Sequence, residues 1–202
     1  MIAIIDYGMG NVASIQKALN YLQLKSTVTS DHSQISDAEC LILPGVGSFK
    51  QGMLNLRQRK LDDLLTKLVV TEKKSFLGIC LGMQLIAEYG TEPEFCHGLG
   101  WIKGDVKKIE LTGRRVPHMG WNDIEIKKPK FYEGIKSMDF YFIHSYHFIP
   151  QDESVIDSYV NYGTRLVSSI QYENIFATQF HPEKSQESGL KLLKNYFASV
   201  KG

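Results

Sequence analysis

The stretch Lys74-Ser75-Phe76-Leu77-Gly78-Ile79-Cys80-Leu81-Gly82-Met83-Gln84 joins a buried strand to a helix. An apolar run leads into Cys80, which stands between two glycines, and a helical pattern then continues to Ala87. Such a Gly-x-Cys-x-Gly turn is the thiol counterpart of the Gly-x-Ser-x-Gly turn that holds a nucleophile at the end of a strand. Glycines are needed there because a side chain flanking so sharp a turn would collide with the neighbouring strand or helix.

Two interpretations of Cys80 follow from this turn alone. As a nucleophile, Cys80 would lie at a helix N-terminus, where the positive end of the helix dipole favours the thiolate. The N–H of Leu81 would then point into the same space and could donate a hydrogen bond to an oxyanion. Alternatively, Cys80 is a buried core cysteine on an ordinary strand-to-helix turn.

A second motif, His181-Pro182-Glu183, follows a predicted strand over residues 174–180. A histidine at a strand end can act as a general base, and a carboxylate two residues later can orient its imidazole and stabilise the charged form. A lone His-x-Glu is common in proteins. Together with Cys80, however, the motif completes a set of nucleophile, base and orienting group.

These two motifs resemble the signatures of the class I, triad-type glutamine amidotransferases. Further matches resemble, more narrowly, the glutaminase subunits of imidazole glycerol phosphate synthases. The matching stretches are Asp6-Tyr7-Gly8-Met9-Gly10-Asn11, Leu43-Pro44-Gly45-Val46-Gly47, Pro117-His118-Met119-Gly120-Trp121-Asn122 and Phe142-Ile143-His144-Ser145-Tyr146. The likeness extends from Met1 to about Ala198, and the stretch from Pro117 to Asn122 is its most specific part.

The resemblance implies a role for several residues besides Cys80, His181 and Glu183. It implies that Val46 and Leu81 supply the oxyanion donors. Glutamine would be bound by Gly45, Gly47, Gln84, Glu92, Ser145 and Tyr146, and a partner subunit would be contacted by Asn11, His118 and Trp121. Alternatives from the residues alone remain for three of them: Glu92 as an exposed glutamate, Tyr146 as a packing residue and Trp121 as a core residue.

Composition indicates an ordinary soluble domain. The chain has 202 residues, 43% hydrophobic residues and a net charge of +1, so we expect one domain over residues 1–202 and neither a nucleic-acid nor a membrane surface. The apolar start lacks the basic residues and cleavage site of a signal peptide. Three widely spaced cysteines imply no disulfide framework, and we expect a cytoplasmic protein.

The order of the predicted elements indicates an α/β fold. Apolar strands alternate with helices up to Glu88, which predicts a parallel sheet with right-handed crossovers. After Gly90 strand patterns predominate until a C-terminal amphipathic helix that begins near Ser185 or Ser188. With the resemblance, we expect a flavodoxin-like, class I amidotransferase fold: a largely parallel central sheet flanked by helices, with antiparallel strands added in the C-terminal half.

Two other kinds of site are disfavoured. The loop from Gly8 to Asn11 lacks the third glycine of a dinucleotide-binding turn. Cys96-His97 has no second Cys or His at metal-ligand spacing, so no metal is expected. The predicted chemistry needs no cofactor.

We therefore expect a glutaminase that hydrolyses L-glutamine to L-glutamate and ammonia. The resemblance implies a heterodimer with a (β/α)8-barrel cyclase, which uses the ammonia to make imidazole glycerol phosphate and aminoimidazole carboxamide ribotide in histidine biosynthesis. Three alternatives stay open: a related glutaminase that supplies another acceptor pathway, such as amino-sugar synthesis, a non-catalytic subunit that activates its partner by binding, and an unrelated cysteine hydrolase. The last would not explain the stretch from Pro117 to Asn122.

Overall fold

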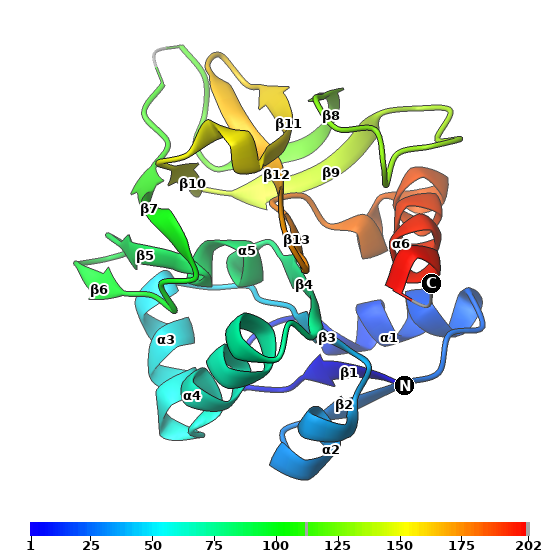
Figure 1. Cartoon of the computed structure of the whole chain (residues 1–202). Coiled ribbons are helices and arrows are strands. Elements are labelled where there is room, and N and C mark those ends of the chain that lie inside the picture. Colours follow the sequence, from blue (N-terminus) through cyan, green and yellow to red (C-terminus); the bar gives the residue numbers. More distant parts are fainter. Residues whose placement is uncertain (112, 201–202) are drawn as a thin grey trace.

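A nine-stranded sheet forms the centre of the molecule in the computed structural model, which describes residues 1–111 and 113–200 (Figure 1). In spatial order its strands are β2 (Ser26–Thr29), β1 (Ile2–Ile5), β3 (Cys40–Leu43), β4 (Ser75–Ile79), β13 (Ile175–Thr178), β12 (Arg165–Tyr172), β11 (Ile156–Asn161), β8 (His118–Ile126) and β9 (Asp139–His144).

The strand pairing changes from parallel to antiparallel across this sheet. Strands β2, β1, β3, β4 and β13 pair in parallel, and every pair from β13 to β9 is antiparallel. All residues of β1, β3 and β13 are buried, as expected for parallel strands covered on both faces. The predicted parallel sheet with an antiparallel extension in the C-terminal half is confirmed.

Helices cover both faces of the parallel strands (Figure 1). Helices α1 (Val12–Tyr21) and α6 (Gln186–Val200) share one apolar cluster. The cluster on the opposite face includes side chains of α2 (His32–Asp37), α3 (Phe49–Gln58), α4 (Leu61–Thr66) and α5 (Leu81–Leu85). A π-helical turn, Lys67–Thr71, extends α4. The parallel strands therefore lie between two helical layers.

A second, four-stranded sheet has the order β10 (Tyr146–Pro150), β7 (Ile102–Lys108), β5 (Ala87–Gly90) and β6 (Cys96–His97). Its residues Val106 and Phe148 are fully buried in the same cluster as Phe49 of α3. Short 3-10 turns occur at Glu153–Val155 and Pro182–Lys184. The second of these turns carries Glu183, so it belongs to the site described below.

Three local expectations need correction. The helix after Cys80 ends at Leu85 instead of Ala87, because the carbonyls of Leu85 and Ile86 accept hydrogen bonds from the distant amides of Leu99 and Trp101. The chain then continues directly as β5. Strand patterns from Val116 onward and over residues 123–126 predict two strands, but the structure has one continuous strand there, β8. Helix α2 was not predicted.

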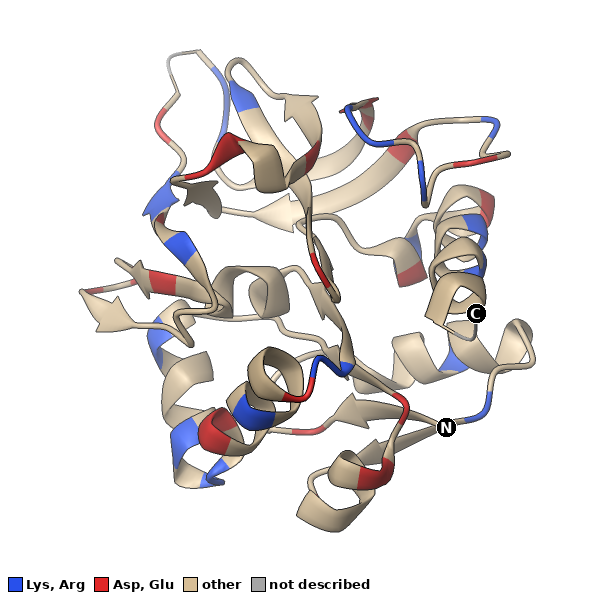
Figure 2. Cartoon of the chain, in the orientation of Figure 1, with Lys and Arg blue, Asp and Glu red and all other residues tan. Residues whose placement is uncertain are grey.

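Charged residues of both signs are distributed over the outer parts of the fold, although the side chains of Asp157 and Glu183 are buried. Figure 2 shows Lys and Arg mixed with Asp and Glu over the outer helices and loops, whereas β1, β2, β3, β4 and β13 carry no charged residue. Within residues 1–111 and 113–200, no helix has the length and apolar character needed to cross a membrane.

Candidate active site

Cys80 occupies a strained turn between β4 and α5. Its backbone has φ 54° and ψ −107°, a combination that residues with a side chain rarely adopt. The Cys80 N–H donates to Thr178 O at 2.7 Å, which ties the turn to the end of β13. A Cβ on Gly82 would lie 1.8 Å from Leu43 O, so only glycine allows α5 to pack this closely on β3. The predicted strand–turn–helix unit is thus confirmed.

His181 and Glu183 lie beside Cys80, because β13 is the neighbour of β4. Nδ1 of His181 is 2.8 Å from Oε1 of Glu183, and each side chain is only 2% exposed. The backbone of His181 is held by bonds to Tyr141 O and from Ser185 Oγ. Among the described residues, Nε2 of His181 has no hydrogen-bond partner, so this nitrogen remains available for proton transfer.

The charges at this site favour a protonated His181. Burial alone would lower the pKa of His181, but the adjacent Cys80 sulfur and the Glu183 carboxylate together raise the pKa to about 10. A protonated imidazole beside the sulfur is the arrangement that activates a cysteine nucleophile. His144, on the wall of the same site, stays neutral because burial lowers its pKa to about 3.

A cavity of about 390 Å³ opens over Cys80. Its lining includes most of the residues expected to bind glutamine or an oxyanion: Val46, Gly47, Leu81, Gln84, Glu92, Ser145 and Tyr146. Oε2 of Glu92 accepts a bond from the Phe49 N–H at 3.2 Å, and burial raises the pKa of this carboxyl. The structure thus brings these predicted residues together around one cavity beside the nucleophile.

The expected oxyanion donors are not both free in this structure. The Leu81 N–H donates to Gly45 O at 3.3 Å. In a planar trans peptide the Val46 N–H points opposite to the Gly45 carbonyl, so it points away from Leu81. The next residue, Gly47, has φ +114°, a conformation that favours glycine. Leu81 and Val46 therefore do not form an oxyanion site in this arrangement.

The side chain of Gln84 is also held by hydrogen bonds within the protein. Its side-chain amide donates to Tyr146 O at 2.9 Å and to Oε1 of Gln179 at 3.0 Å. Gln179 is fully buried and was missed as a site residue, although Nε2 of Gln179 lies 3.6 Å from the Cys80 sulfur. Its position two residues before His181 was the available signal, since alternate side chains of an extended segment point to the same side.

The residues expected to contact a partner have different environments. Trp121 is 41% exposed on β8, and Asn11 is an exposed residue whose side chain caps α1. His118 is fully buried, hydrogen-bonded to His144 at 2.9 Å and stacked on Tyr162. The expectation that the His118 side chain lies in a docking face is wrong, because the ring is part of a buried polar network.

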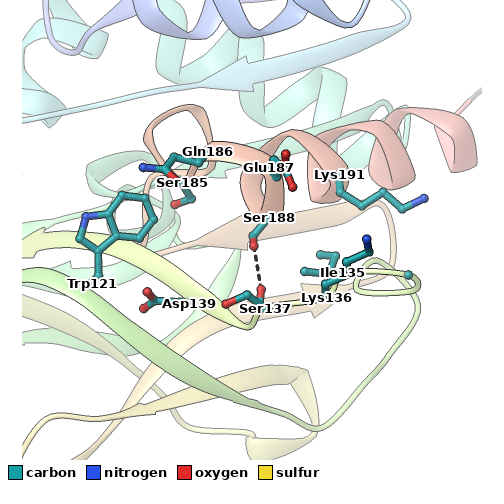
Figure 3. A pocket seen from close by; sticks show the side chains of 11 residues that line it. Trp121, Ile135, Lys136, Ser137, Asp139, Ser185, Gln186, Glu187, Ser188 and Lys191 are labelled. Atoms are coloured by element: carbon teal, nitrogen blue, oxygen red, sulfur yellow. Dashed lines mark hydrogen bonds between the residues drawn. The ribbon is translucent and has the colours of Figure 1, made fainter.

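A larger cavity, of about 580 Å³, lies at the start of α6 and does not include Cys80 (Figure 3). Trp121 and Asp139 lie on one side of it, and the first turn of α6 lies on the other, where Ser188 Oγ donates to Ser137 O at 2.7 Å. Its lining includes none of Cys80, His181 and Glu183, so the smaller cavity over Cys80 is the better substrate site. Within the described ranges, no group of three His, Cys, Asp or Glu side chains is arranged to hold a metal ion.

Comparison with known proteins is consistent with this site. The model of the family "Glutamine amidotransferase class-I" matches residues 3–200. Imidazole glycerol phosphate synthase subunit HisH 1 of Campylobacter jejuni (strain 81-176) is 47% identical over 97% of this chain and 98% of its own length. Subunit HisH of Aquifex aeolicus is 46% identical over 96% of this chain and 94% of its own length.

A solved glutamine amidotransferase structure has a TM-score of 0.77 and 21% identity, and the match covers 99% of this chain and 98% of that one. This likeness confirms the predicted amidotransferase fold. Together with the family model and the HisH relatives, it leads to one conclusion: the chain belongs to the class I glutamine amidotransferase family.

Proposed function

We propose that this protein hydrolyses L-glutamine to L-glutamate and ammonia, with Cys80 as nucleophile, His181 as acid and base, and Glu183 as the group that orients His181. The observation that carries the proposal is the strained Cys80 turn beside a histidine whose Nδ1 is 2.8 Å from Glu183. A core cysteine would need neither the strain nor the buried charges. The family membership supports the same chemistry.

The reaction has two halves. The Cys80 thiolate attacks the side-chain amide carbon and forms a tetrahedral oxyanion. As this intermediate collapses, the His181 imidazolium gives its proton to the departing nitrogen, so ammonia leaves and a thioester remains. Neutral His181 then takes a proton from water, the hydroxide attacks the thioester, and collapse releases glutamate and restores the thiolate–imidazolium pair.

Efficient turnover requires a local rearrangement. The oxyanion needs the Leu81 N–H, which is bonded to Gly45 O in this structure. Rotation of the peptide between Gly45 and Val46 would free that donor and turn the Val46 N–H toward the cavity. Each oxyanion donor contributes roughly 3 kcal/mol to transition-state stabilisation, so we expect slow hydrolysis until this peptide rotates.

A partner subunit is the proposed cause of that rotation. The HisH relatives are named as subunits of imidazole glycerol phosphate synthase, and we propose that this chain likewise pairs with a (β/α)8-barrel cyclase that consumes the ammonia in histidine biosynthesis. Apolar side chains on the paired strands β8 and β9 support a docking face beside the Cys80 cavity, whose lining includes Ile143: Met119, Trp121 and Ile143 are 59%, 41% and 36% exposed. Exposed aromatic and aliphatic residues of this kind commonly anchor interfaces.

We further propose that the protein acts in the cytoplasm. All three cysteines are free thiols, and the proposed chemistry requires Cys80 to stay reduced.

The test compares Cys80→Ala with Cys96→Ala, a matched change of a buried cysteine on β6. Cys80→Ala should abolish glutamine-dependent product formation by the complex and leave ammonia-dependent formation by the cyclase intact, whereas Cys96→Ala should retain both. Loss of both activities in folded, assembled Cys80→Ala would contradict this division of labour. Glutamine hydrolysis that a histidine-pathway cyclase does not stimulate would instead favour another acceptor, such as an amino sugar.

A further inference from the structure

Gln179 is a fully buried polar residue that immediately follows β13. Its backbone N–H donates to Ser168 O at 2.8 Å, which fixes the residue to β12. The side chain lies between Gln84, at 3.0 Å, and the Cys80 sulfur, at 3.6 Å. An amide buried this deeply costs free energy unless its polar atoms are bonded, so these two contacts account for its place in the core.

The hydrogen bonds fix which way the Gln179 amide points. Tyr146 O can only accept, so the Gln84 group 2.9 Å from it must be the NH2. That same NH2 faces Gln179, which must therefore present its carbonyl oxygen to Gln84. Its own NH2 is consequently directed at the Cys80 sulfur. The orientation follows from donor and acceptor chemistry along the chain from Tyr146 to Cys80.

We propose that Gln179 is a positioning residue for the nucleophile: its amide N–H donates to the Cys80 thiolate, and Gln84 holds that amide in place. This role deepens the proposed glutaminase function and rests on it. A charge-assisted hydrogen bond to an anion is about twice as strong as one between neutral groups, so the contact favours thiolate over thiol.

The neighbouring groups considered next are poorly placed to donate a lasting hydrogen bond to the Cys80 thiolate. His181 is the charged neighbour, and it must give up its proton during turnover. The Tyr7 hydroxyl, also close to Cys80, donates to Pro44 O at 2.8 Å and is held there. Ile143 O lies 3.8 Å from the sulfur and can accept from a thiol but gives nothing to a thiolate. His144 is neutral and bonded to Tyr146 O and His118. Gln179 therefore offers a donor that persists when His181 is neutral.

The experiment measures the pH dependence of Cys80 alkylation by iodoacetamide, resolved from Cys40 and Cys96 by peptide mass spectrometry, in the full chain. Gln179→Met keeps the volume and removes the donor, and Gln179→Glu keeps the shape and replaces the donor by an acceptor. Gln171→Met is the control, because Gln171 lies on β12 and, within residues 1–111 and 113–200, its side chain makes no hydrogen bond to the groups around Cys80.

We expect the alkylation midpoint to rise by about one pH unit in Gln179→Met and further in Gln179→Glu, as expected for loss of a bond to a charged group. In the complex, kcat for glutamine should fall about 10-fold with KM changed less than about 2-fold. Gln171→Met should match the wild type. An unchanged midpoint in either folded Gln179 variant overturns the proposal, even if the free energy of unfolding falls. A raised midpoint in a protein that never releases glutamate would leave the positioning intact and refute the glutaminase function instead.

Discussion

The proposed nucleophile, Cys80, has an unfavourable backbone conformation. This strain predicts which of two variants at this position is the more stable to unfolding. At φ 54° and ψ −107°, any side chain is strained, whereas glycine is not. We therefore expect Cys80→Gly to be more stable to unfolding than Cys80→Ala. Both variants lack the sulfur, so lost sulfur contacts cancel in the comparison.

The expected difference is about 1 kcal/mol. A residue held in such a sparsely populated region costs about 1–3 kcal/mol, which glycine relieves. In the opposite direction, the greater conformational freedom of glycine in the unfolded chain lowers the stability of Cys80→Gly by about 0.5–1 kcal/mol. For a chain of this length, a difference of about 1 kcal/mol raises Tm by about 2–4 °C.

Urea unfolding followed by circular dichroism measures this difference directly. Ala13→Gly in the exposed first turn of α1 is the control, and there glycine should reduce the free energy of unfolding by up to about 1 kcal/mol. If Cys80→Gly is less stable than Cys80→Ala by the same amount as in the control, the turn is not strained. That result would refute the role of backbone strain in presenting the nucleophile.

Three further predictions concern separate features. Burial raises the pKa of Asp157 to about 6 from an ordinary value of 3.8. Between these two pH values the folded state holds a proton that the unfolded state has lost, so the protein loses stability as the pH rises from 3.8 to about 6. In urea titrations, the free energy of unfolding of Asp157→Asn should therefore exceed that of the wild type by up to about 3 kcal/mol at pH 8 and equal it near pH 4. A difference independent of pH would contradict this. Glu183→Gln removes a charge that raises the pKa of His181, so it should slow Cys80 alkylation at pH 7 and lower glutamate release at least about 100-fold; equal rates would count against the role of Glu183. Trp121→Ala should weaken binding to the cyclase by about 2 kcal/mol, roughly 30-fold by calorimetry, without changing Cys80 alkylation, and unaltered affinity would place the docking face elsewhere.

The features that followed from the sequence are those set by local chain chemistry. The turn at Cys80 was predictable because glycines on both sides of a cysteine, directly after an apolar run, are typical of a sharp strand-to-helix turn. The parallel sheet followed from the alternation of apolar strands and helices. His181 and Glu183 lie beside Cys80 because they follow β13, and β13 is the neighbour of β4, which leads into the Cys80 turn.

The features that did not follow depend on contacts between distant segments. The helix after Cys80 stops at Leu85 because amides from residues 99–102 bind its last carbonyls, which no local pattern reveals. His118 carries a polar side chain in a strand, and only the packing of Tyr162 and Phe142 against its ring shows that it is buried. The hydrogen bond between Leu81 and Gly45 likewise depends on how the loop after β3 meets the start of α5, so the occupied oxyanion donor was not foreseen.

The central claim is that Cys80 forms a covalent bond to the glutamine side chain. The most direct measurement is rapid acid quenching of the cyclase complex during glutamine turnover, followed by peptide mass spectrometry. We predict a γ-glutamyl thioester on Cys80, absent without glutamine and absent from the peptides that contain Cys40 and Cys96. Continuous glutamate release with an unmodified Cys80 in every quenched sample, or a glutamyl group on a different residue, would contradict the claim.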